Sequence, residues 1–172
     1  MKNSINIAVV GLGQVGIYLL NELNIKKKEI ELKTGKKINV VAVSARNINK
    51  KRRFKINKKI FYKNPLEIFN KTKVDILFEA IGLSDGISKK IVETALKKKI
   101  HVVTPNKALI SKHGDYLAKL AEDNDVNLEF EASVAGGIPI LRTIKEGLAT
   151  NKIFKVYGIL NGTSNYILSE ME

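Results

Sequence analysis

Three glycines near the start of the chain, Gly11, Gly13 and Gly16, have the spacing that could bind a dinucleotide. They follow an apolar run, Ile5–Val10, and precede a helix-like run from Ile17. Between a strand and a helix, this spacing allows a tight turn, close approach of the backbone to a pyrophosphate, and close helix packing. The helix start would offer free N–H groups to the phosphates. The predicted contact residues are Gly11, Gly13, Gln14, Val15 and Gly16.

The end of the next expected strand, Ile38–Ser44, indicates which dinucleotide the chain would bind. In NAD-selective folds an acidic residue ends this strand and bonds the ribose 2′-OH. Here no acid is present, and Arg46 follows Ser44 closely. The planar guanidinium of Arg46 could donate two N–H bonds to a 2′-phosphate, helped by Ser44, so both residues are predicted cofactor contacts. The sequence therefore favours NADP(H) over NAD(H), with an ordinary solvated arginine as the alternative.

Two later strand ends carry further candidates, because ligands of open α/β sheets bind outside the carboxyl ends of the strands. The expected strands are Val74–Ile81 and Ile100–Thr104. Lys107, which follows the second, is the candidate catalytic residue, although a lysine that only begins a helix would look the same. The predicted cofactor contacts at these two ends are Ile81, Gly82, Thr104, Asn106 and Lys107.

The elements that must position these residues alternate between apolar strands and helical patterns. A further strand is expected at Val126–Glu131. Helices are expected at Gln14–Asn24, at Lys107–Asn124 and after Ser84, whose side chain could cap the helix that follows it. The alternation predicts an α/β fold: a doubly wound Rossmann-type parallel sheet with helices on both faces. Segment Asn47–Asn64 is expected to be mostly loop, and Pro65–Asn70 a short helix.

The pattern changes after Ala135, where Gly136-Gly137-Ile138-Pro139 breaks the alternation. A helix is expected at Ile140–Thr150, a strand at Ile153–Leu160, and another helix from Thr163. We therefore predict two domains. Residues 1–135 form the dinucleotide-binding domain, and residues 136–172 form the incomplete start of an α+β substrate domain.

Composition narrows the class of protein. The 172 residues include no cysteine, which excludes disulfides and thiolate catalysis and favours a reducing cytoplasmic setting. There is neither an apolar run of membrane-spanning length nor a signal-peptide pattern, so no membrane partner is expected. The net charge of +13 comes from dispersed lysine runs without interleaved aromatic residues. We therefore predict no nucleic-acid partner. DNA binding whose affinity falls steeply with salt concentration would instead support the alternative of a nucleic-acid-binding protein.

Three later segments, together with the glycine turn and in this order, resemble homoserine dehydrogenase. They are His101–Leu109, Glu131–Ile140 and Gly158–Leu168. The resemblance implies reversible, nicotinamide-dependent interconversion of L-homoserine and L-aspartate 4-semialdehyde, in threonine and methionine biosynthesis. It also implies that Lys107, in the matching Asn-Lys motif, lies at the nicotinamide and the substrate.

The resemblance implies two further sites. The segment from Glu131 matches the monovalent-cation loop of the family, in which Na⁺ would be held by the Glu131 side chain and by backbone carbonyls. A domain-crossing hinge with Glu131 at the surface remains compatible with this role. The carbonyls would come from Val134, Gly136 and Ile138. The turn Asn161-Gly162-Thr163 would lie over the cofactor and substrate cleft, and Ser164 stands where the family usually has threonine.

The resemblance also has limits. Homoserine dehydrogenases continue with an acidic, proline-containing segment that binds the substrate amino group, then an aspartate and a second lysine, and none of these follows here. We therefore expect a truncated chain with weak or no activity, whose homodimer-forming domain is incomplete. The alternatives are a nucleotide-binding or regulatory fragment without catalysis, and another nicotinamide enzyme of amino-acid metabolism. A semialdehyde dehydrogenase would need a nucleophilic cysteine, which is absent.

Overall fold

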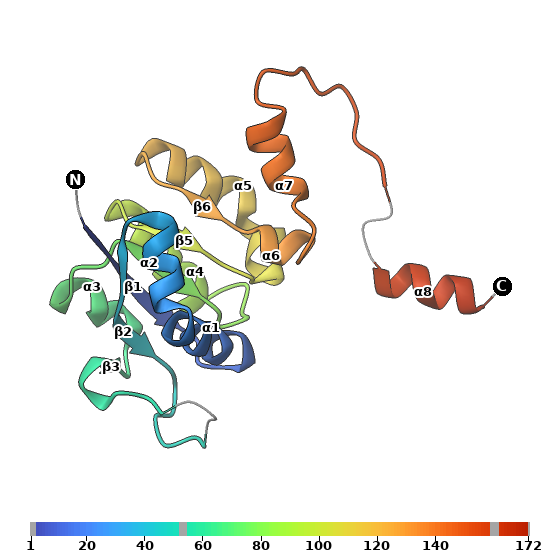
Figure 1. Ribbon diagram of the computed structural model, residues 1–172. Coiled ribbons are helices and arrows are strands. Elements are labelled where there is room, and N and C mark those ends of the chain that lie inside the picture. Colours follow the sequence, from blue (N-terminus) through green and yellow to red (C-terminus); the bar gives the residue numbers. More distant parts are fainter. Residues whose placement is uncertain (1–2, 52–54, 159–161, 172) are drawn as a thin grey trace. The chain divides into compact units, whose positions relative to one another are not determined.

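The computed structural model describes residues 3–51, 55–158 and 162–171 (Figure 1). The chain divides into two units, Met1–Val134 and Ala135–Glu172. The described part of the first unit holds a six-stranded sheet in the order β3-β2-β1-β4-β5-β6, and all of its strand pairs are parallel. The direction of strand succession reverses between β1 and β4. The predicted doubly wound Rossmann-type sheet is therefore confirmed.

The first unit alternates strands and helices along the chain. Its strands are β1 Ser4–Val10, β2 Lys37–Ser44, β3 Phe61–Tyr62, β4 Ile76–Glu79, β5 His101–Val103 and β6 Leu128–Glu129. Its α-helices are α1 Gln14–Ile25, α2 Lys27–Thr34, α3 Ile68–Lys71, α4 Ile87–Lys97, α5 Lys107–Asp123 and α6 Glu131–Val134. Two single 3₁₀ turns are η1 Lys58–Ile60 and η2 Pro65–Glu67.

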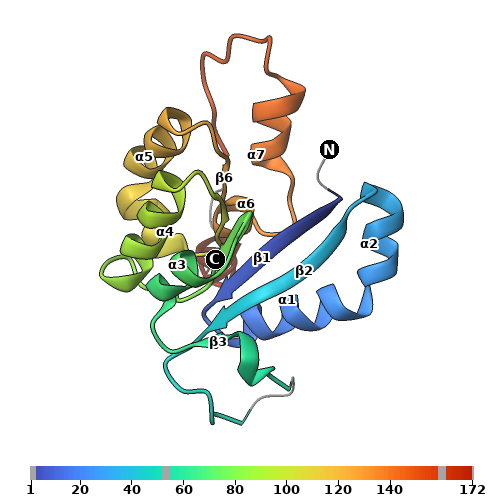
Figure 2. The ribbon, with the colours of Figure 1, turned by 90° about the vertical axis from the view of Figure 1, so that its left-hand side faces the viewer.

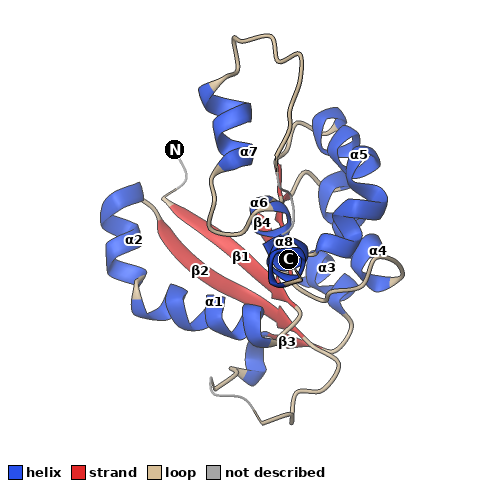
Figure 3. Ribbon diagram, turned by 90° about the vertical axis from the view of Figure 1, so that its right-hand side faces the viewer, coloured by secondary structure: helices blue, strands red, loops and turns tan. Residues whose placement is uncertain are grey.

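Two apolar cores lie on opposite faces of the sheet, because successive side chains of a strand point to opposite sides. In β1, Ile7 and Val9 belong to the core under α1, while Ala8 and Val10 belong to the core that includes α4 and α5. Figures 2 and 3 show α1 on one side of the strands and α3, α4 and α5 on the other. The sheet is thus held in place from both faces, with its carboxyl edge between the two helical layers.

Local sequence signals were correct at some boundaries and wrong at others. Pro65 opens a 3₁₀ turn that the Asn64 side chain caps, close to the short helix expected there. Ser84 does not cap α4: Gly86 is the N-cap, and the Ser84 hydroxyl donates to Asp85 instead. Glu131 does not end a strand but begins α6. The loop expected over Asn47–Asn64 contains η1 and the short edge strand β3.

The second unit contains α7 Ile140–Arg142, which continues into the π-helical turn η3 Thr143–Gly147, and α8 Gly162–Glu170. The strand expected at Ile153–Leu160 is wrong over 153–158, which has no regular structure, and its last two residues lie outside the described ranges. None of the described side chains of this unit is buried. Across the described parts of both units, no helix combines the length and apolarity needed to cross a membrane.

Candidate functional site

The glycine turn joins the ends of three neighbouring strands. Gly11 adopts φ +95°, a conformation that glycine tolerates best, and its N–H donates to the Ser44 carbonyl at the end of β2 over 2.9 Å. A Cβ on Gly11 would lie 2.3 Å from the Ala80 carbonyl oxygen, just beyond β4. No side chain fits there without moving the backbone, so the turn depends on glycine at this position.

The two other glycines of the motif have opposite surroundings. A Cβ on Gly16 would lie 2.1 Å from the Gly11 carbonyl oxygen, so glycine lets α1 pack directly on the turn. A Cβ on Gly13 would meet no atom within 4 Å, so the backbone there faces open space. Gly13 is also the N-cap of α1, and its residue type supplies no side-chain cap to the helix. The turn therefore leaves room over a helix N-terminus, where backbone N–H groups and the helix dipole attract anions.

Other predicted contacts of the turn lie at its exposed side. Gln14 and Val15, in the first turn of α1, are exposed, as is Arg46 two residues beyond β2. Ser44 is only 2% exposed, so its side chain is buried while its carbonyl fixes Gly11. The stretch from Ser44 to Lys51 contains no acidic residue.

The adjacent edge of the sheet, beyond β4 and β5, brings other predicted residues together through a carboxylate that was not predicted. Glu79, the last residue of β4, is fully buried. Its Oε1 accepts hydrogen bonds from the Ile81 N–H at 2.8 Å and the Ser88 hydroxyl at 3.0 Å, and its Oε2 accepts from the Thr104 hydroxyl at 2.7 Å. The Asn106 amide lies 3.3 Å from both oxygens. Three predicted cofactor contacts thus share one acceptor.

Asn106 fixes the beginning of α5. Its side-chain oxygen caps the helix by accepting from the Leu109 N–H at 3.2 Å, and its amide also donates to the Leu83 carbonyl at 2.8 Å. The next residue, Lys107, is exposed at the first position of the helix. Gly82, the remaining predicted contact, is exposed with φ +86° in the loop after β4. The candidate catalytic lysine therefore directly follows Asn106, whose buried side chain is hydrogen-bonded through both its oxygen and its amide.

An exposed ionic cluster lies next to this edge. The Asp85 carboxylate, just before α4, accepts from Lys112 Nζ at 2.7 Å and pairs with His113 Nε2 at 2.9 Å, both on α5. The Ser84 hydroxyl donates to it at 2.7 Å. The hydrogen bond from Lys112, followed by those from Ser84 and His113, holds the pKa of Asp85 well below its usual range. The cluster ties α4 to α5.

The residues predicted to hold Na⁺ fall in both units. Glu131 and Val134 bound α6 in the first unit, and Gly136 and Ile138 belong to the second. In the second unit the Ile138 carbonyl accepts from the Ile140 N–H at 2.8 Å. Within the described ranges no cluster of three or more His, Cys, Asp or Glu side chains is arranged for a metal. The ligand set, which depends mainly on carbonyls, stays a prediction.

The predicted cleft turn cannot be placed as a whole. Asn161 lies outside the described residues, while Gly162 and Thr163 begin α8.

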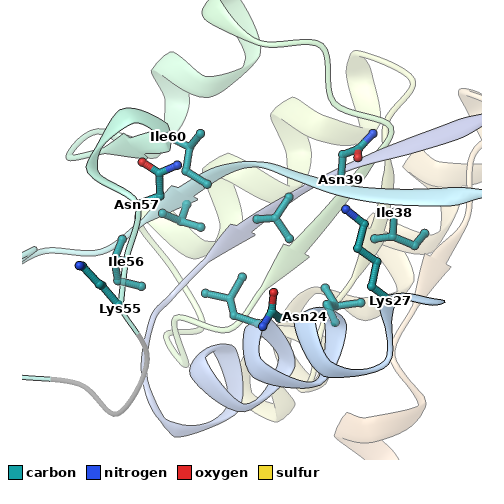
Figure 4. Close-up of a pocket in the computed structure, with 12 residues that line it drawn as sticks. Asn24, Lys27, Ile38, Asn39, Lys55, Ile56, Asn57 and Ile60 are labelled. Carbon is teal, nitrogen blue, oxygen red and sulfur yellow. The ribbon is translucent and has the colours of Figure 1, made fainter. Parts of the chain in front are cut away.

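A separate hollow of about 320 Å³ lies beside β2 on the α1 face of the sheet (Figure 4). Apolar side chains such as Ile38 and Ile60 line it, together with polar ones. The polar lining residues are Asn24, Lys27, Asn39, Lys55 and Asn57. None of the predicted site residues lines this hollow, so it is distinct from the carboxyl edge.

Comparison with known proteins agrees with the predicted resemblance. A family model described as "Homoserine dehydrogenase, NAD binding domain" matches residues 11–131, and one described as "Homoserine dehydrogenase" matches residues 139–172. A homoserine dehydrogenase of Neisseria gonorrhoeae is 40% identical over 97% of this chain and 38% of its own length. One of Bacillus subtilis is 36% identical over 98% of this chain and 39% of its own length.

Solved structures give the same result. A homoserine dehydrogenase from Thiobacillus denitrificans matches with a TM-score of 0.83 and 38% identity, over 98% of this chain and 38% of that one. One from S. aureus matches with a TM-score of 0.79 and 38% identity, over 99% of this chain and 40% of that one. This chain thus spans about 38% of the length of the curated relatives. The predicted resemblance is confirmed, and the chain belongs to the homoserine dehydrogenase family of oxidoreductases.

Proposed function

We propose that this chain provides the cofactor-binding part of an enzyme that interconverts L-homoserine and L-aspartate 4-semialdehyde with NADP(H), in threonine and methionine biosynthesis. The family match supports the reaction class, and the lack of cysteine is compatible with a reducing cytoplasm. The observation that carries the proposal is the glycine turn. It is closed to side chains at Gly11 and Gly16 and open at Gly13, directly before the N-terminus of α1.

The residues divide the work of binding and chemistry. The first N–H groups of α1 bind the pyrophosphate, and the exposed Arg46 favours a 2′-phosphate over a free ribose hydroxyl, while the buried Ser44 fixes the glycine turn through its carbonyl. When bound, the nicotinamide supplies or accepts the hydride. Lys107, exposed at the start of α5, holds or moves the proton at the substrate oxygen. Contacts from Ile81, Gly82, Thr104 and Asn106 orient the cofactor at the same edge.

Replacing Gly13 with valine tests the cofactor site with little disturbance of the fold. A side chain at Gly13 has open space around it and an ordinary backbone conformation, so the domain should fold. The side chain would occupy the space that a phosphate needs. We expect Gly13→Val to weaken NADPH binding about tenfold or more, which corresponds to at least about 1.4 kcal/mol. Titration followed by NADPH fluorescence, with circular dichroism to verify folding, measures this.

Gly147→Val is the matched control. Gly147 lies in η3 of the second unit, and a Cβ there would also meet no atom closer than 3.9 Å. We expect its NADPH affinity to equal that of the wild type. Equal affinity in Gly13→Val and the wild type, or no saturable NADPH binding by the wild type, would contradict the proposed cofactor site.

The second unit has a separate proposed role as the start of the catalytic and dimerisation domain, with Gly162 and Thr163 in the substrate turn. We also propose that Glu131 and the carbonyls of Val134, Gly136 and Ile138 hold Na⁺. A carboxylate with carbonyls is a hard oxygen donor set that suits such an ion. The test is whether Na⁺, against matched K⁺, raises the melting temperature of the wild type but not of Glu131→Gln.

A nucleotide-binding module without catalysis is the second candidate. The observation that favours it is that the family model of the NAD-binding domain alone matches residues 11–131, which is most of the chain. Both candidates require NADPH binding, so the distinguishing measurement is homoserine-dependent turnover.

A further inference from the structure

Glu79 is the one ionisable side chain among the buried residues that the structure describes, and no assigned role accounts for it. Taking an ionisable side chain out of water is unfavourable unless hydrogen bonds replace its hydration. Glu79 has no exposed surface, and the described contacts that surround it are uncharged donors. A leucine would fill the same space and would need no hydrogen bonds. The reason for a carboxylate at this position must therefore lie in the groups that it binds.

Its partners come from three separate segments of the cofactor edge. The Ile81 N–H belongs to the turn after β4, Ser88 lies in the first turn of α4, and Thr104 directly follows β5. The side-chain amide of Asn106, just before α5, donates to both Glu79 oxygens. A carboxylate can accept all of these bonds at once, because both of its oxygens are acceptors. Glutamine, which has the same shape, would turn an NH₂ group toward some of these donors.

The hydrogen bonds of Asn106 connect Glu79 to the start of α5, where Lys107 lies. The Asn106 N–H donates to Thr104 Oγ1 at 3.0 Å, and its side-chain oxygen caps the N–H of Leu109. Both ends of the Asn106 side chain are therefore engaged, and its orientation is set by the Glu79 oxygens at 3.3 Å together with the Leu83 carbonyl at 2.8 Å. Since α5 begins at Lys107, the direction of the first helical turn is set by the same bonds.

We propose that Glu79 is the positioning residue of this edge, and that it orients Asn106 and the first turn of α5 so that Lys107 meets the bound cofactor. The proposal rests on the proposed function for its purpose. Its structural content, the orientation of Asn106 and of the α5 cap, does not depend on a bound ligand.

Three variants, two single and one double, test the proposal in the intact chain. Glu79→Gln keeps the shape but removes acceptors. Ile91→Val removes a buried methyl group from α4 in the same core and serves as the destabilised control. In Glu79→Gln we expect the Leu109 amide to exchange with solvent faster than in Ile91→Val, by roughly threefold to tenfold, and NADPH to bind weaker by a similar factor. Exchange followed by NMR and NADPH fluorescence measure the two effects.

The double variant Glu79→Gln/Asn106→Asp is the rescue. The carboxylate at position 106 would accept from the new amide at position 79 and would still accept from the Leu109 N–H, but it could no longer donate to the Leu83 carbonyl, which Asn106 contacts at 2.8 Å. We expect slow exchange at Leu109 to return in part in the double variant. Exchange and NADPH affinity in Glu79→Gln equal to those in Ile91→Val would overturn the proposal. If the wild type does not bind NADPH, the proposed function fails by itself, and the exchange at Leu109 still decides the role of Glu79.

Discussion

Arg46 is exposed just beyond β2, in a stretch without acidic residues. If it binds the 2′-phosphate, its removal affects NADPH and leaves NADH nearly unchanged. Hydrogen bonds to charged groups contribute about 1.5–3 kcal/mol, so Arg46→Ala should weaken NADPH binding roughly tenfold to a hundredfold. Parallel fluorescence titrations with NADPH and NADH measure the ratio of the two affinities.

The control for this prediction is Arg142→Ala, which removes another exposed arginine, from α7 in the second unit. Both affinities should stay unchanged in that variant. An Arg46→Ala protein that loses NADPH and NADH affinity equally would show that this arginine contributes only a general positive field.

Individual site residues differ in how well the sequence could reveal them. Gly11 and Gly16 were predictable because each meets a steric need that the structure shows, a tight turn and close packing of α1, while the role of Gly13 at the pyrophosphate stays a prediction. Glu79 was not, since within Val74–Ile81 an acid looks like an ordinary strand residue. Its donors follow it by two to twenty-seven positions along the chain. Only the neighbouring placement of β4 and β5 brings them together.

At the scale of elements, Asp85 links α4 to α5 and predicts a pH effect on stability. Its folded-state pKa is lowered from an ordinary value of 3.8, chiefly by the hydrogen bond from Lys112. The stabilisation is therefore present above the unfolded pKa and is lost as pH falls through the lower folded pKa. In Asp85→Asn the melting temperature should be lower near neutral pH and should fall less steeply than that of the wild type below about pH 4.

Melting temperatures by circular dichroism between about pH 2.5 and 7 check this difference. Asp115→Asn removes an exposed carboxyl from the same helix α5 and serves as the control, with a pH profile parallel to the wild type. An Asp85→Asn protein whose pH profile is also parallel to the wild type would contradict the stabilising role of the cluster.

Elements were predictable where a long apolar pattern also had a partner. The strands β1 and β2 and the helices α1 and α5 begin and end within two residues of their expected bounds. The edge strand β3 has only two residues, too few for a periodic signal. The apolar residues Ile153, Phe154 and Val156 suggested a strand, but all three are exposed and irregular. A strand needs a neighbour to pair with, and composition alone does not supply one.

At the scale of the whole molecule, the two units differ in how they are stabilised. The first has apolar cores on both faces of its sheet. In the second, the described side chains bury little, and large apolar ones such as Phe154, Tyr157 and Met171 are 77–86% exposed. The family model of the NAD-binding domain matches the first unit, while the proposed substrate turn belongs to the second. Binding and turnover should therefore separate in this chain.

The expected result is NADPH binding with weak or no turnover. Homoserine-dependent reduction of NADP⁺, measured in sodium-containing buffer, should stay far below the rate of about 1 per second that is modest for enzymes. Any turnover that is seen should disappear in Lys107→Ala, because the exposed lysine at the start of α5 is the proposed proton-transfer group. Lys119→Ala removes an exposed lysine farther along the same helix and should leave the rate unchanged. Rapid turnover that survives in Lys107→Ala would exclude this lysine from the chemistry and would show that the weakly packed second unit is sufficient for the reaction.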